Sequence, residues 1–475
     1  MRSVSAPVNL VVKRFKRRIS AKKFIKPTCI AVTLAAMGVI AIGKAEAAVD
    51  TETAFVLNTF SFLVHGVLVM FMAAGFAMLE SGLVRSKNTA AICLKNIALY
   101  SIAGLMYYII GYALMYTDVD AGRLGGWIGA FEFLYNPAGA ELALLNAVDA
   151  GKAAANAALL KGSTYASMSD WFFQMVFVAT AASIVSGTLA ERIKVWPFLI
   201  FVVVLTGVIY PIQGPWVWGA GWLSEMGFSD FAGSTLVHST GGWAALAGAL
   251  VLGARKGKFG PDGQVNPLPG ANLPLATLGT FILWFGWFGF NGGSQLALGS
   301  AADAAAIAIV YVNTNLAAAA GVVVAMIMTQ LLFKKMDLTL CLNGAIGGLV
   351  AITAGPDLQQ HAHTILIGGI GGAWVVIAVP QIDKLRVDDV VGALSAHLVC
   401  GIWGTLAVGI FGSGSIVTQF IGIVAIGAFV FTTSLIVWLI LKVTIGIRVD
   451  EEAELAGLDT SELGMEACPE FGRGL

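Results

Sequence analysis

Charged residues are scarce in this chain. Only 12% of its 475 residues are Asp, Glu, Lys or Arg, whereas 57% are apolar or aromatic. A water-soluble globular protein carries about a quarter charged residues, so this composition excludes an ordinary soluble fold. The 28 basic and 28 acidic side chains cancel, which excludes a nucleic-acid-binding protein. Most of the surface must therefore face lipid.

Cysteine and histidine are also few, with five of each. Cys93, Cys341 and Cys400 fall inside apolar segments, and their spacing is typical neither of a disulfide framework nor of a metal site. The chain also lacks a recognisable nucleophile, cofactor-binding loop or metal cluster. We therefore expect a protein that is not an enzyme and that has no cofactor.

The first 47 residues have the pattern of a secretory signal peptide. Eight basic residues between Lys13 and Lys26 precede the apolar run 28–43, and Ala45-Glu46-Ala47 supplies a small-residue cleavage site. We expect the mature chain to begin near Ala48. The alternative is a retained first transmembrane helix.

The mature chain contains eleven apolar runs of the length that a bilayer requires, about 20 residues each. Unpaired backbone groups cannot lie in hydrocarbon, so the spans must be helices and not open strands. The sequence predicts an all-α polytopic membrane domain, 48–446, followed by a tail, 447–475. The expected transmembrane helices are 54–79, 90–115, 168–190, 195–214, 232–254, 272–293, 303–333, 338–355, 363–380, 391–412 and 416–444.

The basic residues of the mature chain predict its orientation. They gather after spans one, three, five, seven and nine, as Arg85, Lys87 and Lys95; Arg192 and Lys194; Arg255, Lys256 and Lys258; Lys334 and Lys335; Lys384 and Arg386. The connections after spans four, six, eight and ten hold no Lys or Arg. By the positive-inside rule, the mature N-terminus lies outside and the tail in the cytoplasm.

One sequence pattern occurs twice. Residues 230–242 and 389–401 both read D-x2-G-x4-H-x3-G, at the starts of the fifth and tenth spans. Two matches five spans apart predict duplicated five-helix halves, 54–254 and 272–412. Because five is an odd number, the two halves must be inverted in the membrane.

His238 and His397 hold the same position in the two copies. Each lies eight residues into its motif, about 12 Å at 1.5 Å per residue, and the two spans start at opposite faces. Both imidazoles are therefore expected near mid-membrane, where an ionisable residue faces the bundle interior or a cavity. With one donor and one acceptor nitrogen each, two neutral rings suit a path for a small polar molecule. Two histidines alone make a poor metal site, so we expect no metal.

Glycine is abundant within spans eight and nine, for example Gly344, Gly348, Gly368 and Gly372. Small residues allow membrane helices to approach closely, so we expect these glycines to serve packing and not ligand contact.

Further motifs lie along the whole mature chain: Gly82-Leu-Val-Arg-Ser-Lys-Asn88, Leu189-Ala-Glu-Arg-Ile193, Gly286-Trp-Phe-Gly-Phe-Asn-Gly-Gly-Ser294, Val312-Asn-Thr314 and Glu451-Glu-Ala-Glu-Leu-Ala-Gly-Leu-Asp459. Together with the two histidine motifs, they make the chain resemble the ammonium transporter family of Amt, Mep and Rhesus proteins. The resemblance implies eleven helices around one pore per subunit, assembled as a homotrimer. It also implies ammonium or ammonia as substrate, with methylammonium as an analogue.

The resemblance assigns an outer ammonium-recruitment site to Trp218, Phe177 and Ser294. Aromatic faces attract a compact cation, and a hydroxyl oxygen accepts an N–H bond, so these residue types suit that role. Trp216 is an alternative to Trp218, but the spacing to Asp230 favours Trp218.

Inward of that site, the resemblance places Phe290 with Phe177 as a stacked phenyl gate and His238 with His397 as the pore lining. Three residues support the site, namely Asp230 and its counterpart Asp389, which we expect to cap helices, and Thr314. The other histidines, His65 in span one and His361 and His363 in an outer loop, match no functional position and are expected to be structural or solvated.

The function implied is inward ammonium transport, in which the cation loses its proton and ammonia passes the histidines. One alternative is an ammonium sensor that signals through a partner at its tail, and another is a Rhesus-like ammonia channel, which Trp218 and the acidic tail disfavour. A PII-type signalling protein is a common partner in the family. Leu398, Leu463 and Cys468 depart from the family pattern, and the last two bear on how the tail docks and meets such a partner.

Overall fold

The protein is described here from a computed structural model that covers residues 49–119 and 125–468. The predicted signal peptide, 1–47, and the last residues of the predicted tail lie outside the described residues. All elements below belong to one unit, Asp50–Leu475.

The described residues form ten helical segments long and apolar enough to cross a membrane, and a shorter apolar helix makes the eleventh. The predicted all-α, eleven-helix architecture is therefore confirmed. The elements of the spans are α2 (Thr51–Leu83), α3 (Thr89–Met106) with η4 (Tyr107–Gly111) and α4 (Tyr112–Tyr116), α7 (Ser167–Leu189), α8 (Val195–Val204) with η5 (Leu205–Ile209), α9 (Tyr210–Gln213) and η6 (Gly214–Trp216), η7 (Ser234–Ser239) with α11 (Thr240–Leu252), α12 (Leu273–Gly293), α13 (Ala301–Phe333), the short α14 (Leu338–Ile352), α15 (His361–Lys384), η8 (Leu394–Val399) with α16 (Cys400–Phe411), and α17 (Ile416–Thr444).

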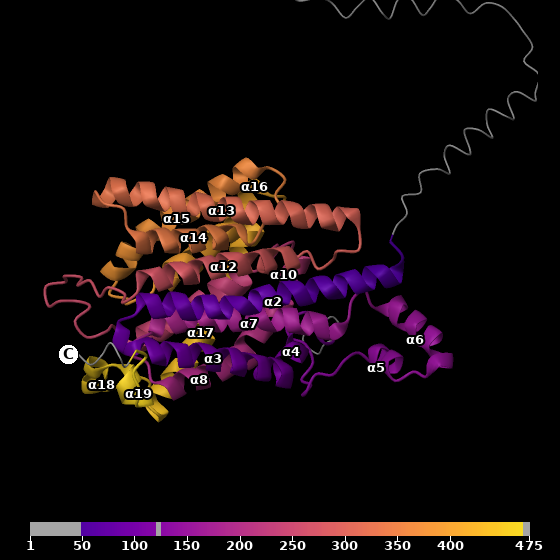
Figure 1. The fold of residues 1–475 in the computed structure, drawn as a ribbon, viewed down its shortest axis with the longest axis horizontal. Coiled ribbons are helices and arrows are strands. Elements are labelled where there is room, and N and C mark those ends of the chain that lie inside the picture. The colour runs from indigo at the N-terminus through magenta and orange to yellow at the C-terminus, as the bar shows by residue number, and fades with distance from the viewer. Residues whose placement is uncertain (1–48, 120–124, 469–475) are drawn as a thin grey trace, which may run out of the picture. The chain divides into compact units, whose positions relative to one another are not determined.

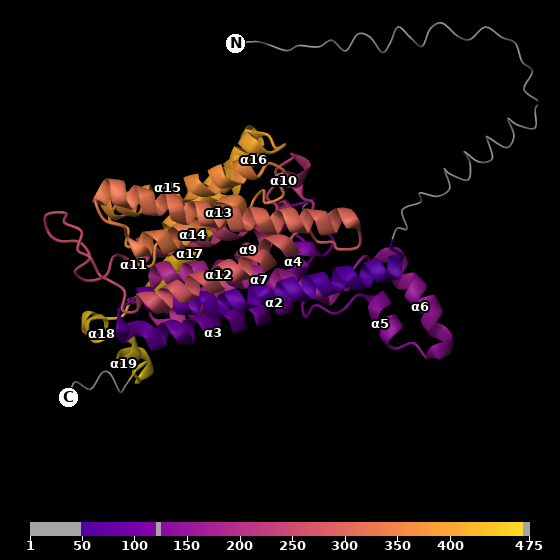
Figure 2. The same cartoon turned by 45° about the horizontal axis from the view of Figure 1, so that its top comes forward.

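Short helices mark the two ends of the bundle. Helices α5 (Gly139–Leu145) and α6 (Asp149–Gly162) lie at one end, and α18 (Glu451–Ala456) and α19 (Leu458–Leu463) lie at the other (Figures 1 and 2). We call these the α5–α6 end and the tail end. The placement of His361 and His363 in a loop was wrong, because α15 begins at His361, two residues before the apolar run 363–380 that predicted it.

The two halves begin at opposite ends of the bundle. Helix α2 ends at the tail end, where a Cβ on Gly82 would lie 2.5 Å from the carbonyl oxygen of Asn272, the residue that caps the start of α12. At the other end of this pair, a Cβ on Gly293 would lie 2.7 Å from Cβ of His65. Helices α2 and α12, the first of each half, therefore run antiparallel, as inversion requires.

The Asp and Gly residues that the two copies of the motif share each have a structural role. Asp230 accepts hydrogen bonds from four backbone N–H groups at the start of η7, and Asp389 accepts two at the start of η8. Such groups have no partner within their own helix, so an Asp before the helix satisfies them. The glycines that follow, Gly233 and Gly392, have φ of +107° and +80°, a conformation that L side chains rarely adopt.

The last glycine of each motif lies where the two copies cross. A Cβ on Gly242 would lie 2.6 Å from Cβ of Leu398, and one on Gly401 would lie 2.5 Å from Ser239 Oγ. Only a residue without a side chain allows this approach, which brings the two histidine-bearing turns together. Leu398, which departs from the family pattern, packs directly against Gly242.

Glycines also bring α13, α14 and α15 into close contact, as the sequence predicts. A Cβ on Gly371 would lie 2.6 Å from the carbonyl oxygen of Gly347, and those on Gly348 and Gly368 would meet backbone atoms of Ala317. These glycines contact helices and line none of the cavities described below.

A buried ionic cluster closes the tail end. Asp388 receives hydrogen bonds from the guanidinium of Arg255, which also lies 3.3 Å from Glu191, and Glu191 pairs with Arg85. Burial alone would raise the pKa of Asp388, but the charges of Arg192 and Arg255 hold that pKa well below its usual range. The cluster joins the connections after spans one, three, five and nine.

The tail docks on this end of the bundle. Asp459 in α19 accepts bonds from the backbone N–H groups of Ala90 and Ala91 in the first turn of α3, and Lys87 donates to the carbonyl oxygen of Leu455. An acidic side chain at a helix N-terminus satisfies free amides and complements the helix dipole. The tail is thus held by the start of the second span.

Replacing Gly401 by Ala should force the two copies of the motif apart. Overpacking of this kind costs about 1–3 kcal/mol, so we expect the purified protein in detergent to unfold at a lower temperature. Gly139→Ala in α5 is the matched control, since nothing lies within 4 Å of its added Cβ. Equal unfolding midpoints for the two variants would contradict the tight crossing.

Candidate functional site

The two motif histidines meet at the centre of the bundle. His238 is carried by η7 and His397 by η8, and their side chains are buried, with relative exposures of 0% and 3%. Their Nδ1 atoms lie 3.2 Å apart, and the rings stack with centroids 5.3 Å apart and an interplanar angle of 23°. One Nδ1 must donate and the other accept, so neutral rings hold different tautomers.

Aromatic rings surround this pair. His238 stacks on Trp287 at 4.9 Å and lies 5.3 Å from Phe290, and His397 lies 6.2 Å from Phe76. Trp287 is itself fixed by a 2.8 Å hydrogen bond from its Nε1 to Thr353 Oγ1. Within the described residues, His238 Nε2 has no hydrogen-bond partner, so one polar atom is left free in an apolar surrounding.

Two phenyl rings separate the histidines from the α5–α6 end. Phe177 on α7 and Phe290 on α12 stack with centroids 3.9 Å apart and an interplanar angle of 22°. Their relative exposures are 1% and 0%, so the two rings leave no opening between the cavity above them and the histidines. Because Phe290 also touches His238, the stacked phenyl pair lies directly against the histidine pair.

A cavity of about 330 Å³ opens above the phenyl pair, toward the α5–α6 end. Trp218, Phe177 and Ser294 all line it, so the structure brings together the three residues of the expected recruitment site. Trp218 meets Phe177 edge-on at 6.0 Å and donates from Nε1 to the carbonyl oxygen of Asp230. Trp216, the alternative, does not line the cavity and donates to the carbonyl oxygen of Trp127.

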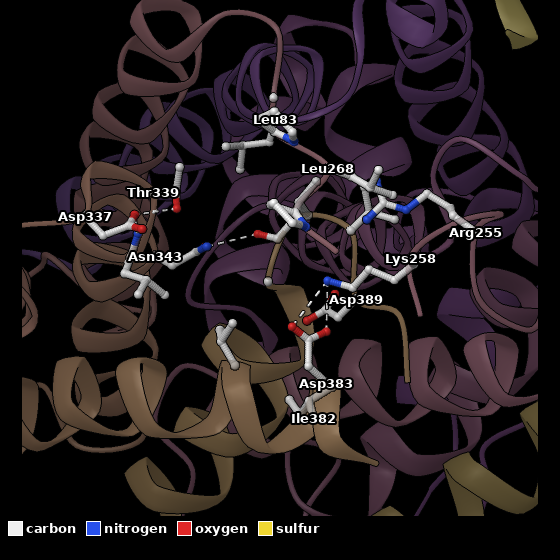
Figure 3. A pocket seen from close by; sticks show the side chains of 18 of the residues that line it. Leu83, Arg255, Lys258, Leu268, Asp337, Thr339, Asn343, Ile382, Asp383 and Asp389 are labelled. Carbon is white, nitrogen blue, oxygen red and sulfur yellow. Dashed lines mark hydrogen bonds and ion pairs between the residues drawn. The ribbon is translucent and has the colours of Figure 1, made fainter. Parts of the chain in front are cut away.

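The space on the other side of the histidines, toward the tail end, is also narrow. A cavity of only about 10 Å³ lies next to His397, lined by Phe76 and Val391 among others. This is near the lower limit for one water molecule. Beyond it, Val391 also lines a cavity of about 450 Å³ at the tail end, which Lys258 and Asp383 cross as an ion pair (Figure 3).

Of the three supporting residues, Asp389 lines the cavity at the tail end, whereas Asp230 and Thr314 line none of the cavities described here. Burial raises the pKa of Asp230, although four backbone N–H groups favour its charged form. Burial likewise raises the pKa of Asp389 to about 6. Thr314 on α13 accepts a 2.9 Å hydrogen bond from Asn291, which follows Phe290 in the sequence, and this bond ties α13 to α12.

Sequence reasoning missed several residues of the site. Phe76 and Trp287 contact the histidines, and Asp170 and Gln174 line the cavity above the phenyl pair. Trp287 stands within a motif that was recognised, whereas Phe76 is one of many phenylalanines in apolar runs. In the described ranges, no three His, Cys, Asp or Glu side chains gather as a metal site would require.

The chain is similar to known proteins over most of its length. The model of the Ammonium Transporter Family matches residues 60–468. Ammonium transporter Amt2 of Archaeoglobus fulgidus is 40% identical over 442 residues, covering 86% of this chain and 87% of that protein. A putative ammonium transporter of Synechocystis is 40% identical over 432 residues, covering 89% and 92%.

Solved structures with the same fold include a protein titled a sensor Amt protein, with a TM-score of 0.77, 35% identity and coverage of 87% of this chain and 100% of that one. Mep2 of Candida albicans superposes with a TM-score of 0.72 at 26% identity, covering 85% and 89%.

Proposed function

Because this chain belongs to the ammonium transporter family and is a membrane transport protein for ammonium and not an enzyme, we propose that it carries ammonium into the cell by a deprotonation route. Ammonium is captured at Trp218, Phe177 and Ser294, loses its proton near His238, and continues as ammonia past His397. The contact between the two Nδ1 atoms in an apolar surrounding is the observation that carries this proposal.

Capture at the cavity follows from the chemistry of its lining. The ring faces of Trp218 and Phe177 attract a compact cation, an interaction of about 0.5–2 kcal/mol depending on exposure. Ser294 adds a hydroxyl oxygen that accepts an N–H bond, and its own proton is already donated to the carbonyl oxygen of Phe290. The site therefore offers acceptors and aromatic faces to a cation.

Passage beyond the phenyl pair favours a neutral guest. An unpaired ion near the bilayer centre costs several kcal/mol or more, and the rings of Phe177, Phe290 and Trp287 offer no charge to offset that cost. The free Nε2 of His238 gives a passing guest one polar contact. Potassium, which has no proton to give up, would be rejected.

The same proposal covers orientation and assembly. The tail end carries Arg85, Arg192 and Arg255, so by the positive-inside rule it faces the cytoplasm of a bacterial inner membrane and the Trp218 cavity faces outward. We also propose a homotrimer with one pore in each subunit, and a PII-type protein as a candidate partner at the cytosolic face.

A second candidate function is an ammonium sensor. The solved relative titled a sensor Amt protein favours it, and the docking of α19 on the first turn of α3 gives a physical link from the bundle to a cytosolic partner. Ammonium flux through a protein whose tail has no effect on a partner would favour the transporter over the sensor.

Replacing His238 or His397 by Ala should each reduce ammonium-evoked current in vesicles that contain the purified protein by at least about tenfold. Either change removes the hydrogen bond between the Nδ1 atoms of His238 and His397. A factor of ten corresponds to about 1.4 kcal/mol, within the range for a lost buried hydrogen-bond partner. His363→Ala, the same chemical change at a partly exposed ring on α15, should leave the current unchanged. Undiminished currents in both pore variants would count against the assignment.

Replacing Trp218 by Leu should raise the half-saturating ammonium concentration about fivefold with little change in the maximum current. The loss of roughly 1 kcal/mol of cation–π attraction accounts for this shift. Trp222→Leu is the matched control, since Trp222 stacks on Trp127 at the same end but does not line the cavity. An unaltered concentration dependence in the Trp218 variant would exclude the recruitment role.

A further inference from the structure

One face of α7 carries four residues that line the cavity above the phenyl pair. Asp170, Phe173, Gln174 and Phe177 follow the i, i+3, i+4, i+7 spacing that places side chains on the same side of a helix, and all four belong to the cavity lining. Phe177 forms the floor of the cavity as half of the stacked phenyl pair. Asp170 lies two turns away, about 10 Å along the helix axis, toward the mouth.

Asp170 gives this cavity a negative charge. Its residue is only 7% exposed, and Oδ2 accepts a 2.6 Å hydrogen bond from the hydroxyl of Tyr112. The cavity lining includes this one carboxylate and no Lys, Arg or His. Across the described residues, no salt bridge to Asp170 is formed, so its charge has no cationic partner within the protein.

Two more acceptor atoms near Asp170 lack partners. Gln174 is 7% exposed, and its Oε1 makes no hydrogen bond among the described residues; the hydroxyl oxygen of Tyr116 is in the same condition. Both residues line the same cavity. A buried polar atom without a partner costs about 1–3 kcal/mol, so such atoms usually mark a place where a partner binds.

We propose that Asp170, Gln174 and Tyr116 form a second cation-binding subsite at the mouth of the cavity, which takes a small protonated amine such as ammonium or methylammonium. The N–H groups of such a cation supply the donors that these acceptors lack, and its charge matches the carboxylate. Asp170 lies about 10 Å along α7 from Phe177, so this subsite and the Trp218 site are separate positions in the cavity of about 330 Å³.

This inference rests on the proposed function and adds a step before it. The carboxylate concentrates cations at the mouth through charge, which does not distinguish ammonium from other small cations. The aromatic site at Trp218 then selects ammonium from among these cations. The phenyl pair has to open only at that site. The competing explanation is that Asp170 only stabilises the fold, since it lies in the first turn of α7 and accepts a hydrogen bond from Tyr112.

Asp170→Asn separates these explanations. The amide oxygen still accepts the bond from Tyr112, and the shape is retained, but the charge is lost. In vesicles containing the purified full chain, we expect the half-saturating ammonium concentration to rise about tenfold, equivalent to about 1.4 kcal/mol, with the maximum current retained. Calorimetric titration of the same protein with methylammonium should show a matching loss of affinity.

Asp149→Asn is the control, because it removes one charge at the same end of the bundle from a side chain that is 98% exposed on α6 and outside the cavity. It should leave the half-saturating concentration unchanged. If Asp170→Asn does not fold, Gln174→Leu takes its place, with an expected rise of about threefold from the loss of one acceptor.

An unchanged half-saturating concentration in Asp170→Asn, with a raised one in Trp218→Leu, would overturn this subsite and leave the proposed function standing. The absence of ammonium-evoked current from the unaltered protein would instead overturn the proposed function itself.

Discussion

The rest of the structure depends on the cost of placing a charge in the middle of a bilayer. At the centre of the bundle, the chain sets the Nδ1 atoms of two imidazoles 3.2 Å apart and encloses the rings in aromatic side chains. The repeated motif produces this arrangement from both sides: an Asp satisfies the first amides, a glycine turns the chain, and the last glycine lets the copies cross. The fold thus places two polar rings where hydrocarbon would otherwise exclude them.

The two cavities extend this constraint toward water. The one at the α5–α6 end is lined by tyrosines, a tryptophan and one carboxylate, which suit a cation, and the one at the tail end is crossed by the Lys258–Asp383 ion pair. Between them the passage narrows twice, at the phenyl pair and beside His397. The buried ionic cluster and the docked tail join the connections at the tail end, so a change in the tail acts on the start of α3 directly.

Much of the fold could be predicted because the length of each apolar run follows directly from the thickness of the bilayer. The repeat also predicted that His238 and His397 approach each other. Helices α5 and α6 were missed, since they carry no span-length apolar run, and His361 and His363 were misplaced because a helix can begin before its apolar run. Phe76, Asp170 and Gln174 were missed because their importance depends on which helix faces the cavity, which a single sequence with abundant apolar residues does not reveal.

If ammonium crosses by the proposed route, only a guest able to lose a proton passes the two histidines. The most direct test compares the uptake of labelled methylammonium with that of rubidium, a cation of size similar to ammonium that has no proton to give, by vesicles containing the purified protein. We expect methylammonium uptake well above that of protein-free vesicles and rubidium uptake equal to that of protein-free vesicles. Rubidium uptake at a rate comparable to that of methylammonium would contradict it.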